Sequence, residues 1–164
     1  MEPVTIRPAS ASDLAFINEV YNYYVLHSTC TYQEEPSTGE ERRAWFDAHG
    51  PRHPVIIAEV DGRPAGWGAL SLFHGRAAYR FTVEDSVYVR PDLMRRSIGS
   101  AMLAHLIEQA RGLGHHSLLG VIDCDQTPSI ALHERFGFVR ARHLREVGYK
   151  FGRWLDVVHM QLIL

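Results

Sequence analysis

The most informative part of the sequence is Val87-Tyr88-Val89-Arg90-Pro91-Asp92-Leu93-Met94-Arg95-Arg96-Ser97-Ile98-Gly99-Ser100. An apolar strand pattern ends here at a proline, a short basic loop follows, and a helix pattern begins. The first turn of that helix presents unpaired backbone N–H groups at the positive end of the helix dipole, where an anion such as a pyrophosphate fits. Arg95 and Arg96 add positive charge at the rim, and Gly99 lets a ligand approach the backbone. The same pattern is also compatible with a solvated basic loop that caps a helix.

A second segment, Asp125-Gln126-Thr127-Pro128-Ser129-Ile130-Ala131-Leu132-His133-Glu134-Arg135-Phe136-Gly137-Phe138, places polar residues before a short helix that stops at a glycine. In this segment Ser129 is compatible with a simple helix cap, and His133 with an ordinary surface or core histidine.

Hydrophobic periodicity outside these segments predicts alternating elements along the whole chain. Strands are predicted over Val4–Ile6, Pro54–Val60, Ala65–Phe73, Phe81–Arg90 and Leu118–Ile122, from Phe138 onward, and over Tyr149–Leu164. Helices are predicted from Ser10–Asp13 to about His27, from a capping box at Ser37-Thr38-Gly39-Glu40 to about Ala48, over Ile98–Ala110, and from Thr127 or Ser129 to about Phe136. Asp61-Gly62 predicts a hairpin, and the strand–helix–strand alternation after Phe81 predicts a parallel pair. We therefore expect an α/β (mixed α+β) fold, with a central mixed sheet of about six to seven strands and helices on both faces.

Composition predicts one globular domain over residues 1–164. The chain is 46% hydrophobic and 22% charged, which argues against intrinsic disorder. A net charge of −2 argues against nucleic acid or an anionic membrane as a partner. No apolar run is long enough for a membrane span, and Met1–Ser10 does not read as a signal peptide. With Cys30 and Cys124 expected to be reduced, we predict a cytoplasmic protein. No histidine cluster has metal-ligand spacing, so no metal is expected.

The two segments together resemble the N-acetyltransferase (GNAT) superfamily, and most closely its phosphinothricin and methionine sulfoximine acetyltransferase branch. The resemblance covers nearly the whole chain. It rests on Tyr21-Asn22-Tyr23-Tyr24, Thr29–Tyr32, Thr82–Val89, Leu132-His133-Glu134 with Gly137-Phe138, and Gly148–Gly152 with Trp154 and Asp156. The chain departs from the family pattern at three positions: Met94 replaces Gln or Arg, Ser97 replaces the first glycine of the phosphate loop, and Gln126 replaces Asn.

The resemblance implies acetyl-CoA as co-substrate. The residues that it assigns to cofactor binding are Val87, Tyr88, Val89, Arg95, Arg96, Ser97, Ile98, Gly99, Ser100, Gln126 and Ser129. The Val87–Val89 stretch resembles the strand edge that pairs with pantetheine, and a backbone N–H there is expected to stabilise the oxyanion.

The resemblance also places the catalytic base, acting through water, at Glu84 and the general acid at His133. Adjacent strand residues face opposite sides, so only one of Glu84 and Asp85 can line a given cleft, unless a β-bulge breaks the alternation. From the residues alone, Glu84 could instead be a solvent-facing strand residue, and His133 a helix residue that packs against the cofactor.

The residues expected to bind the substrate are Thr29, Thr31, Tyr32, His74, Arg76, Tyr79, Arg80 and Ser86. Arg76 and Arg80 suit bidentate binding of a carboxylate, although two solvated arginines would give the same pattern. The resemblance therefore implies acetyl transfer to the α-amine of a small amino acid or analogue, such as phosphinothricin, methionine sulfoximine or methionine sulfone. The alternatives are a catalytically idle acyl-CoA-binding module, or acetylation of a protein N-terminus or another amine. A homodimer is expected from the resemblance.

Overall fold

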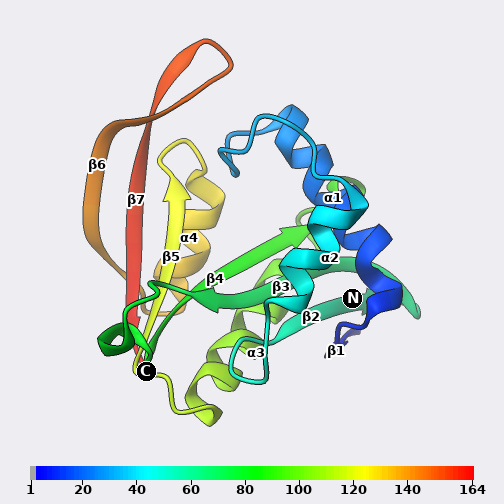
Figure 1. The fold of residues 1–164 in the computed structure, drawn as a ribbon. Coiled ribbons are helices and arrows are strands. Elements are labelled where there is room, and N and C mark those ends of the chain that lie inside the picture. Colours follow the sequence, from blue (N-terminus) through cyan, green and yellow to red (C-terminus); the bar gives the residue numbers. More distant parts are fainter. Residues whose placement is uncertain (1–2) are drawn as a thin grey trace.

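The computed structural model describes residues 3–164, through which a seven-stranded sheet runs in the order β1-β2-β3-β4-β5-β7-β6 (Figure 1). The strands are β1 (Val4–Pro8), β2 (Val55–Val60), β3 (Arg63–Leu72), β4 (Thr82–Val89), β5 (Ser117–Asp123), β6 (Val139–Lys150) and β7 (Arg153–Ile163). Neighbouring strands are antiparallel except for β4 and β5, which are parallel. The predicted mixed sheet and its parallel pair are confirmed.

Helices cover both faces of the sheet, as the sequence predicted (Figure 1). The helices are α1 (Leu14–His27), α2 (Gly39–Asp47), α3 (Ile98–Gly112) and α4 (Thr127–Arg135), with short 3-10 turns η1 (Ala11–Asp13), η2 (Ala77–Tyr79) and η3 (Pro91–Leu93). One face carries α1 and α2, which pack around fully buried Ile57 and nearly buried Trp67. The other face carries α3 and α4, whose core includes the fully buried Met102 and Leu106. Apolar burial on both sides explains why β2, β3 and β5 read as nearly continuous hydrophobic runs.

The capping box of α2 lies one residue after its predicted position. The Thr38 hydroxyl accepts a hydrogen bond from the Glu41 amide at 3.1 Å, and the Glu41 carboxylate accepts one from the Thr38 amide at 2.7 Å. The Ser37 hydroxyl instead accepts a hydrogen bond from the Gln33 side chain at 2.8 Å. A tertiary contact therefore selects between two capping patterns that the sequence offers.

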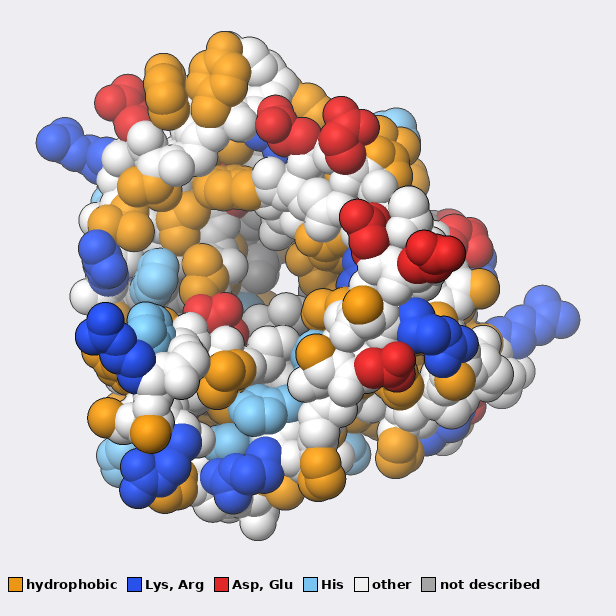
Figure 2. Space-filling view, viewed as in Figure 1, with side chains coloured by type: hydrophobic (Ala, Val, Ile, Leu, Met, Phe, Trp, Pro, Cys, Tyr) orange, Lys and Arg blue, Asp and Glu red, His pale blue; other side chains and the backbone are white. Residues whose placement is uncertain are grey.

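The sheet divides into two arms between β4 and β5. These strands pair only where Thr82–Glu84 lies beside Ser117–Leu119. Beyond Glu84, β4 remains paired with β3, and β5 remains paired with β7, while the two strands diverge from each other (Figure 1). Figure 2 shows a deep hollow in the same face of the molecule. The divergence leaves strand edges that face each other without pairing, and a bound ligand can use such edges.

The described residues contain neither a candidate membrane-spanning helix nor a candidate metal-binding cluster. Between residues 3 and 164, no helix has both the length and the apolar character that a membrane span needs. Over the same range, no three or more His, Cys, Asp or Glu side chains gather in a way that could hold a metal ion.

Candidate active site

Glu84 and Asp85 lie on opposite faces of β4. The β3–β4 register is unbroken from Gly66 opposite Val89 to Leu72 opposite Val83, so no bulge alters the alternation. Asp85 faces α4, as shown by its contact with the helix, and Glu84 therefore faces the side of α1 and α2. Glu84 is half-buried, and its pKa is raised, first by burial and second by the nearby Asp85 charge. A carboxylate with a raised pKa is better suited to accept a proton near neutral pH.

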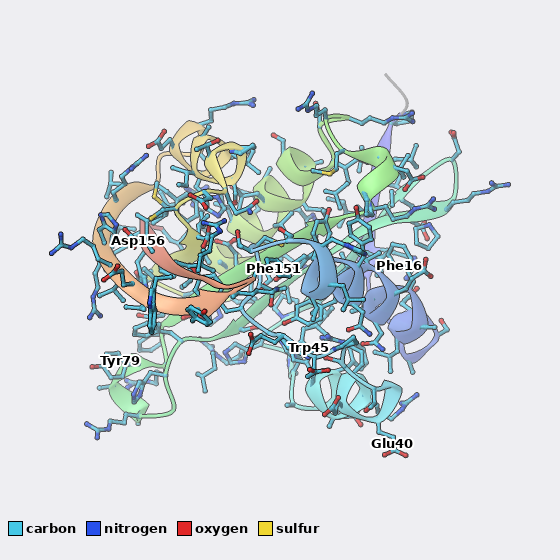
Figure 3. All side chains as sticks on the ribbon, turned by 90° about the horizontal axis from the view of Figure 1, so that it is seen from above. Phe16, Glu40, Trp45, Tyr79, Phe151 and Asp156 are labelled. Atoms are coloured by element: carbon cyan, nitrogen blue, oxygen red, sulfur yellow. The ribbon has the colours of Figure 1, made fainter. Side chains whose placement is uncertain are left out.

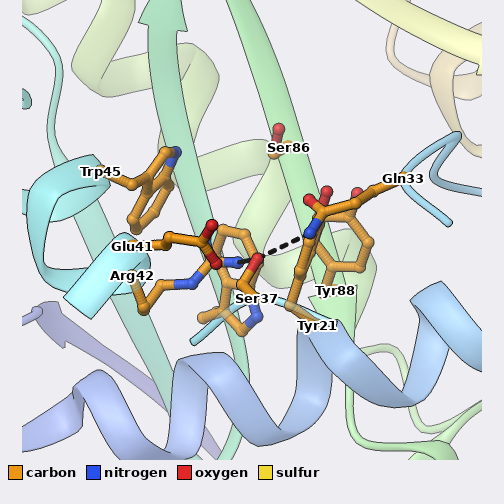
Figure 4. A pocket seen from close by; sticks show the side chains of 9 residues that line it. Tyr21, Gln33, Ser37, Glu41, Arg42, Trp45, Ser86 and Tyr88 are labelled. Carbon is orange, nitrogen blue, oxygen red and sulfur yellow. Dashed lines mark hydrogen bonds between the residues drawn. The ribbon is translucent and has the colours of Figure 1, made fainter. Parts of the chain in front are cut away.

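A cavity of about 520 Å³ lies on the Glu84 face of β4 (Figure 4). It is lined by Tyr21, Gln33, Ser37, Glu41, Arg42, Trp45, Trp67, Ser86 and Tyr88. Ser86 and Tyr88 are two and four residues after Glu84 and share its face of the strand. The volume lies within the range of small-molecule sites, and the lining combines aromatic walls with a few polar groups.

His133 is paired with Asp85 beneath the opposite face of β4. Its ring is 4% exposed, Nδ1 donates to the Ser129 carbonyl at 2.8 Å, and Nε2 lies 3.1 Å from Asp85 Oδ1. Burial lowers the pKa of His133, but the hydrogen bond and charge of Asp85 outweigh burial and hold it above its ordinary value. Gly120 makes this position possible, because a Cβ there would lie 2.7 Å from Nε2. The imidazole is therefore held in place, with a proton favoured on it.

Two of the predicted site residues bind a carboxylate that was not among the predicted residues, and a third joins them through Thr29. Asp123, at the end of β5, accepts hydrogen bonds from the Tyr32 hydroxyl and from Thr29 Oγ1. Gln126 in turn donates to Thr29 Oγ1 at 3.1 Å. Burial and the bond to Asp123 raise the pKa of Tyr32. The network joins the 29–32 loop to the start of α4.

Lys150 fixes the same loop from β6. The residue is 2% exposed, and its ammonium group donates to the Ser28 carbonyl at 2.7 Å and the Thr31 carbonyl at 2.8 Å. The Thr31 hydroxyl is 2.8 Å from the hydroxyl of Tyr21, which lines the cavity. Thr31 therefore contacts a residue of the cavity wall but does not itself line the cavity.

The loop between η3 and α3 has the features expected of an anion site. Arg95 and Ser97 have φ values of 64° and 60°, in the left-handed region. That conformation explains why a glycine is usual at the position of Ser97. Arg95, Arg96 and Ser97 are exposed, and Ser100 lies in the first turn of α3.

Ile98 and Gly99 follow this loop as the first two residues of α3 and differ in what they can offer a ligand. The Ile98 side chain is 1% exposed and packs in the core, so only its backbone N–H is available to a ligand. A Cβ at Gly99 would make only ordinary contacts, at 3.7 Å from both Leu132 and Val89. The protein's own packing therefore does not require this glycine.

Beyond Glu84, the edge of β4 that faces away from β3 already makes some contacts within the chain. The Tyr24 hydroxyl donates to the Val89 carbonyl at 2.6 Å, so this carbonyl is already bonded within the chain. The Tyr88 side chain is part of the cavity wall on the α1 face, and a Val87 methyl lies near Gly99 on the α3 face. Ser129 contributes its carbonyl to His133.

Of the eight predicted substrate residues, only Ser86 lines the cavity. Four of the others lie in and around η2. His74, Arg76, Tyr79 and Arg80 are all exposed in and around η2. Figure 3 shows Tyr79 at the periphery, well apart from Trp45 on α2. Arg80 donates to the Ala77 carbonyl, and its guanidinium stacks 4.5 Å from the Phe81 ring. Arg76 and Arg80 therefore do not line this cavity, and carboxylate binding by these arginines stays a prediction.

Arg42, Asp123 and Lys150 are site residues that sequence reasoning missed. A signal existed for Arg42, because it precedes Trp45 by three residues and Phe46 by four, and so shares their helix face. Asp123 carried a weaker signal, as a carboxylate directly after an apolar strand. No local pattern marks Lys150, since its acceptors are backbone carbonyls more than a hundred residues away.

Comparison with known proteins places the chain among acetyltransferases. The family model described as "Acetyltransferase (GNAT) family" matches residues 18–138. An L-methionine sulfoximine/L-methionine sulfone acetyltransferase of Pseudomonas aeruginosa (strain PAO1) is 38% identical, over 98% of this chain and 94% of the relative. A phosphinothricin N-acetyltransferase of Streptomyces viridochromogenes is 37% identical, over 94% of this chain and 85% of the relative.

A solved structure gives the same result for the fold. It is a GNAT superfamily phosphinothricin acetyltransferase from Sinorhizobium meliloti in complex with AcCoA. The TM-score is 0.95 at 37% identity, and the match covers 98% of this chain and 88% of that one. The family match over residues 18–138 and this nearly full-length structural similarity show that the chain belongs to the acetyltransferase (GNAT) family.

Proposed function

We propose that the protein is an acetyl-CoA-dependent N-acetyltransferase that acts on the α-amine of a small amino acid or analogue. Phosphinothricin, methionine sulfoximine and methionine sulfone are the first candidates, since relatives at 37–38% identity are named for them. The observation that carries the proposal is the position of Glu84. It is half-buried, has a raised pKa, lies where β4 and β5 separate, and shares its strand face with two residues of the cavity wall.

The residues present fit acetyl-CoA. The diverging edges of β4 and β5 offer unpaired backbone groups, and the first turn of the 15-residue helix α3 offers N–H groups beside two exposed arginines. The residues proposed to hold the cofactor are Val87, Tyr88, Val89, Arg95, Arg96, Ser97, Ile98, Gly99, Ser100, Gln126 and Ser129. When bound, acetyl-CoA supplies the thioester whose acetyl group is transferred.

Glu84 acts as the base in this proposal. An ammonium group has no lone pair, so the acceptor amine must lose a proton before it attacks. Glu84 accepts that proton through a water molecule. The amine then attacks the thioester carbonyl and forms the C–N bond, and a backbone N–H of the Val87–Val89 stretch stabilises the oxyanion that results. Collapse of this oxyanion breaks the C–S bond and releases the thiolate.

His133 is the proposed source of the proton for the leaving thiolate. Its pKa is raised, and its partner Asp85 is the first residue of β4 beyond the segment paired with β5. Both ring nitrogens are engaged, so delivery of the Nε2 proton requires the bond to Asp85 to open. A His133→Asn variant tests this role, because it cannot supply an imidazolium proton, and turnover should fall.

The test of the overall function is release of free thiol from acetyl-CoA by the purified protein. The amines are phosphinothricin, methionine sulfoximine, methionine sulfone and spermidine, with a blank lacking amine. We expect release above the blank with at least one of the three amino-acid analogues and none with spermidine. Release with spermidine alone contradicts the substrate class. Tight acetyl-CoA binding without release for any amine, small peptides with a free N-terminus included, favours an idle binding module.

The homodimer and the cytoplasmic location stay predictions. A feature in favour of the dimer is the exposed aromatic tip of the β6–β7 hairpin, where Phe151 is 56% and Trp154 is 61% exposed. Multi-angle light scattering of the eluting protein tests the dimer directly, with a mass near twice 18.6 kDa as the expected result and 18.6 kDa as the contradicting one.

A further inference from the structure

The edge of β4 that faces the fork, where β4 and β5 diverge, presents its backbone groups in a fixed order. Val89 lies opposite Gly66 in the antiparallel β3–β4 pair. The next amide, that of Arg90, donates to the Ala65 carbonyl of β3 at 2.9 Å. Backbone groups of successive residues point to alternate sides of a strand, so the N–H and C=O groups of Val87 and Val89 point away from β3. A ligand in the fork therefore meets Val87 and Val89 in turn.

One group in this row is already bonded within the chain. The Tyr24 hydroxyl reaches the edge from the last turn of α1 and donates to the Val89 carbonyl at 2.6 Å. The peptide between Val89 and Arg90 is therefore held on both sides, by Tyr24 and by β3. Among the described residues β4 pairs with β5 only over Thr82–Glu84, so a ligand is left the N–H and C=O of Val87 and the N–H of Val89.

Aromatic contacts hold the Tyr24 ring in place. Its centre lies 5.4 Å from that of Tyr23 and 5.7 Å from that of Tyr88. Tyr88 in turn stacks on Trp67 at 4.7 Å. Burial raises the pKa of Tyr24 to about 12, so the phenol keeps its proton and stays a donor at neutral pH. The hydroxyl is thus fixed before a ligand arrives, and little side-chain entropy remains to be lost on binding.

An extended ligand can pair with β4 only as far as the Val89 amide. The pantetheine arm of acetyl-CoA carries amide groups, which suit pairing with free N–H and C=O groups of a strand edge. At the Val89 carbonyl this row ends, because Tyr24 occupies the acceptor. The chain then turns into η3 at Pro91, and the first turn of α3 begins at Ile98 with its N–H groups. The phosphate end of the ligand is thereby directed off the strand and toward α3.

We infer that Tyr24 is a positioning residue for acetyl-CoA, which ends the row of backbone groups on β4 and so sets how far the pantetheine arm runs along the strand. The inference rests on the proposed function, because it takes acetyl-CoA as the ligand of the fork. A shift along the strand would move the thioester relative to Glu84. In Tyr24→Phe the Val89 carbonyl loses its donor, and a ligand that covers the edge leaves this acceptor unpaired, which weakens binding.

Isothermal titration of acetyl-CoA into wild type, Tyr24→Phe and Tyr23→Phe tests the inference without relying on turnover. Tyr24→Phe keeps the ring and its aromatic contacts, and urea unfolding verifies that it is folded. Tyr23, 44% exposed on the same helix, provides the matched control. We expect the Kd for acetyl-CoA to rise about 3- to 10-fold in Tyr24→Phe, the range for one hydrogen bond. In Tyr23→Phe it should stay within about twofold of wild type, and an equal rise in both variants overturns the inference.

The nucleotide half of the cofactor distinguishes a positioning role from a general structural one. Adenosine 3′-phosphate 5′-diphosphate carries the phosphates but lacks the pantetheine arm, and competition with acetyl-CoA gives its Kd. We expect Tyr24→Phe to leave this Kd within about twofold of wild type, because α3 and its loop are unchanged. Equal weakening of acetyl-CoA and the nucleotide overturns the inference, as does an unchanged Kd for acetyl-CoA. A nucleotide that does not compete in wild type overturns it too, since the inference directs that half to α3.

The same proteins separate failure of the inference from failure of the proposed function. In thiol-release kinetics the KM for acetyl-CoA should rise with the Kd in Tyr24→Phe, whereas the KM for the amine should stay unchanged. If wild type binds acetyl-CoA but turns over no amine, the proposed function fails, and the Kd comparison still decides the inference. If wild type does not bind acetyl-CoA, both fail, because the fork then has a different ligand.

Discussion

The two faces of β4 use neighbouring carboxylates in opposite ways. On the α1–α2 face, Glu84 is half-buried next to a cavity and has no hydrogen-bond partner among the described side chains. On the α3–α4 face, Asp85 is 3% exposed in its side chain and paired with the buried ring of His133. The contrast separates a carboxylate that is available for chemistry from one committed to structure, although the two are adjacent in the sequence.

Glu84 and Asp85 are both carboxylates, so their different environments come from the alternation of side chains along β4 and not from the type of residue. An unbroken β3–β4 register places one side chain over each face. Had a bulge been present, the two carboxylates would share a face and raise each other's pKa further. Substitutions of the two carboxylates should therefore have different main effects, on kcat for Glu84 and on the free energy of unfolding for Asp85.

The largest effect is expected for Glu84→Gln. The amide cannot accept a proton, so kcat should fall about 100- to 1,000-fold, as for other general bases. The free energy of unfolding should change by less than about 0.5 kcal/mol, since Glu84 has no bonded partner whose loss would destabilise the fold. Thiol-release kinetics and urea unfolding of the same preparation check both parts. A stable protein with undiminished kcat would show that Glu84 is not the base.

Asp85→Ala is the matched change on the other face. It leaves the buried imidazole without its acceptor and should lower the free energy of unfolding by about 3 kcal/mol. Asp85→Asn keeps a hydrogen-bond acceptor, so its loss should be smaller. Urea unfolding of both variants measures the difference, and equal stability of Asp85→Ala and wild type would refute the structural role of the pair.

The same pair predicts a pH dependence of stability. The folded-state pKa of His133 is raised above its ordinary 6.5, so the stabilisation is fully present below about pH 6.5. It is lost as the pH rises through the folded-state pKa. The stability gap between wild type and Asp85→Asn should therefore be wider at pH 5.5 than at pH 9. A gap that widens with increasing pH would contradict this assignment.

Gly120→Ala tests the space that His133 occupies. The new methyl group would lie 2.7 Å from Nε2 and 2.8 Å from Cδ2, so the ring must move away from Asp85. We expect a loss of about 2 kcal/mol, which is typical of overpacking a core. Gly99→Ala is the control for stability, because its methyl group meets neighbours only at 3.7 Å and beyond. Equal unfolding curves for the two variants would show that the ring has room to adjust.

The smallest effect is expected for Ser97→Gly. Ser97 adopts φ 60° at the N-cap of α3, where a Cβ is strained. Glycine removes this backbone strain, but it also raises the conformational entropy of the unfolded chain. The net result should be a stabilisation of the fold by about 0.5 kcal/mol. Calorimetry of the paired proteins measures the shift, and destabilisation would indicate that the serine hydroxyl makes a contact of its own.

Much of the fold could be predicted from the sequence, because local patterns specify it. Short apolar runs and the Asp61-Gly62 turn located the strands, and both turn residues do have positive φ, 52° and 69°. The α2 cap was misplaced by one residue, because Ser37 is engaged by Gln33 from the preceding loop. Such a contact is invisible to a rule that reads only four consecutive residues.

The candidate site was less predictable, because burial decides the role of a charged residue. Arg76 and Arg80 have the chemistry for a carboxylate but lie exposed, whereas Arg42 has the same chemistry and is 4% exposed against a cavity. His133 was selected through the family resemblance, and Glu84 through that resemblance together with its place as a carboxylate on an otherwise apolar strand. Asp123 and Lys150 act through contacts between distant segments, which no local spacing encodes.

The most direct test of the account is the pH profile of kcat/KM for wild type, Glu84→Gln and Asp85→Asn under one set of conditions. The account predicts that wild type and Asp85→Asn both lose activity as the pH falls through the raised pKa of Glu84, while Glu84→Gln is slow and lacks that acidic limb. If the limb persists in Glu84→Gln and disappears in Asp85→Asn, the two faces of β4 have been assigned the wrong way round.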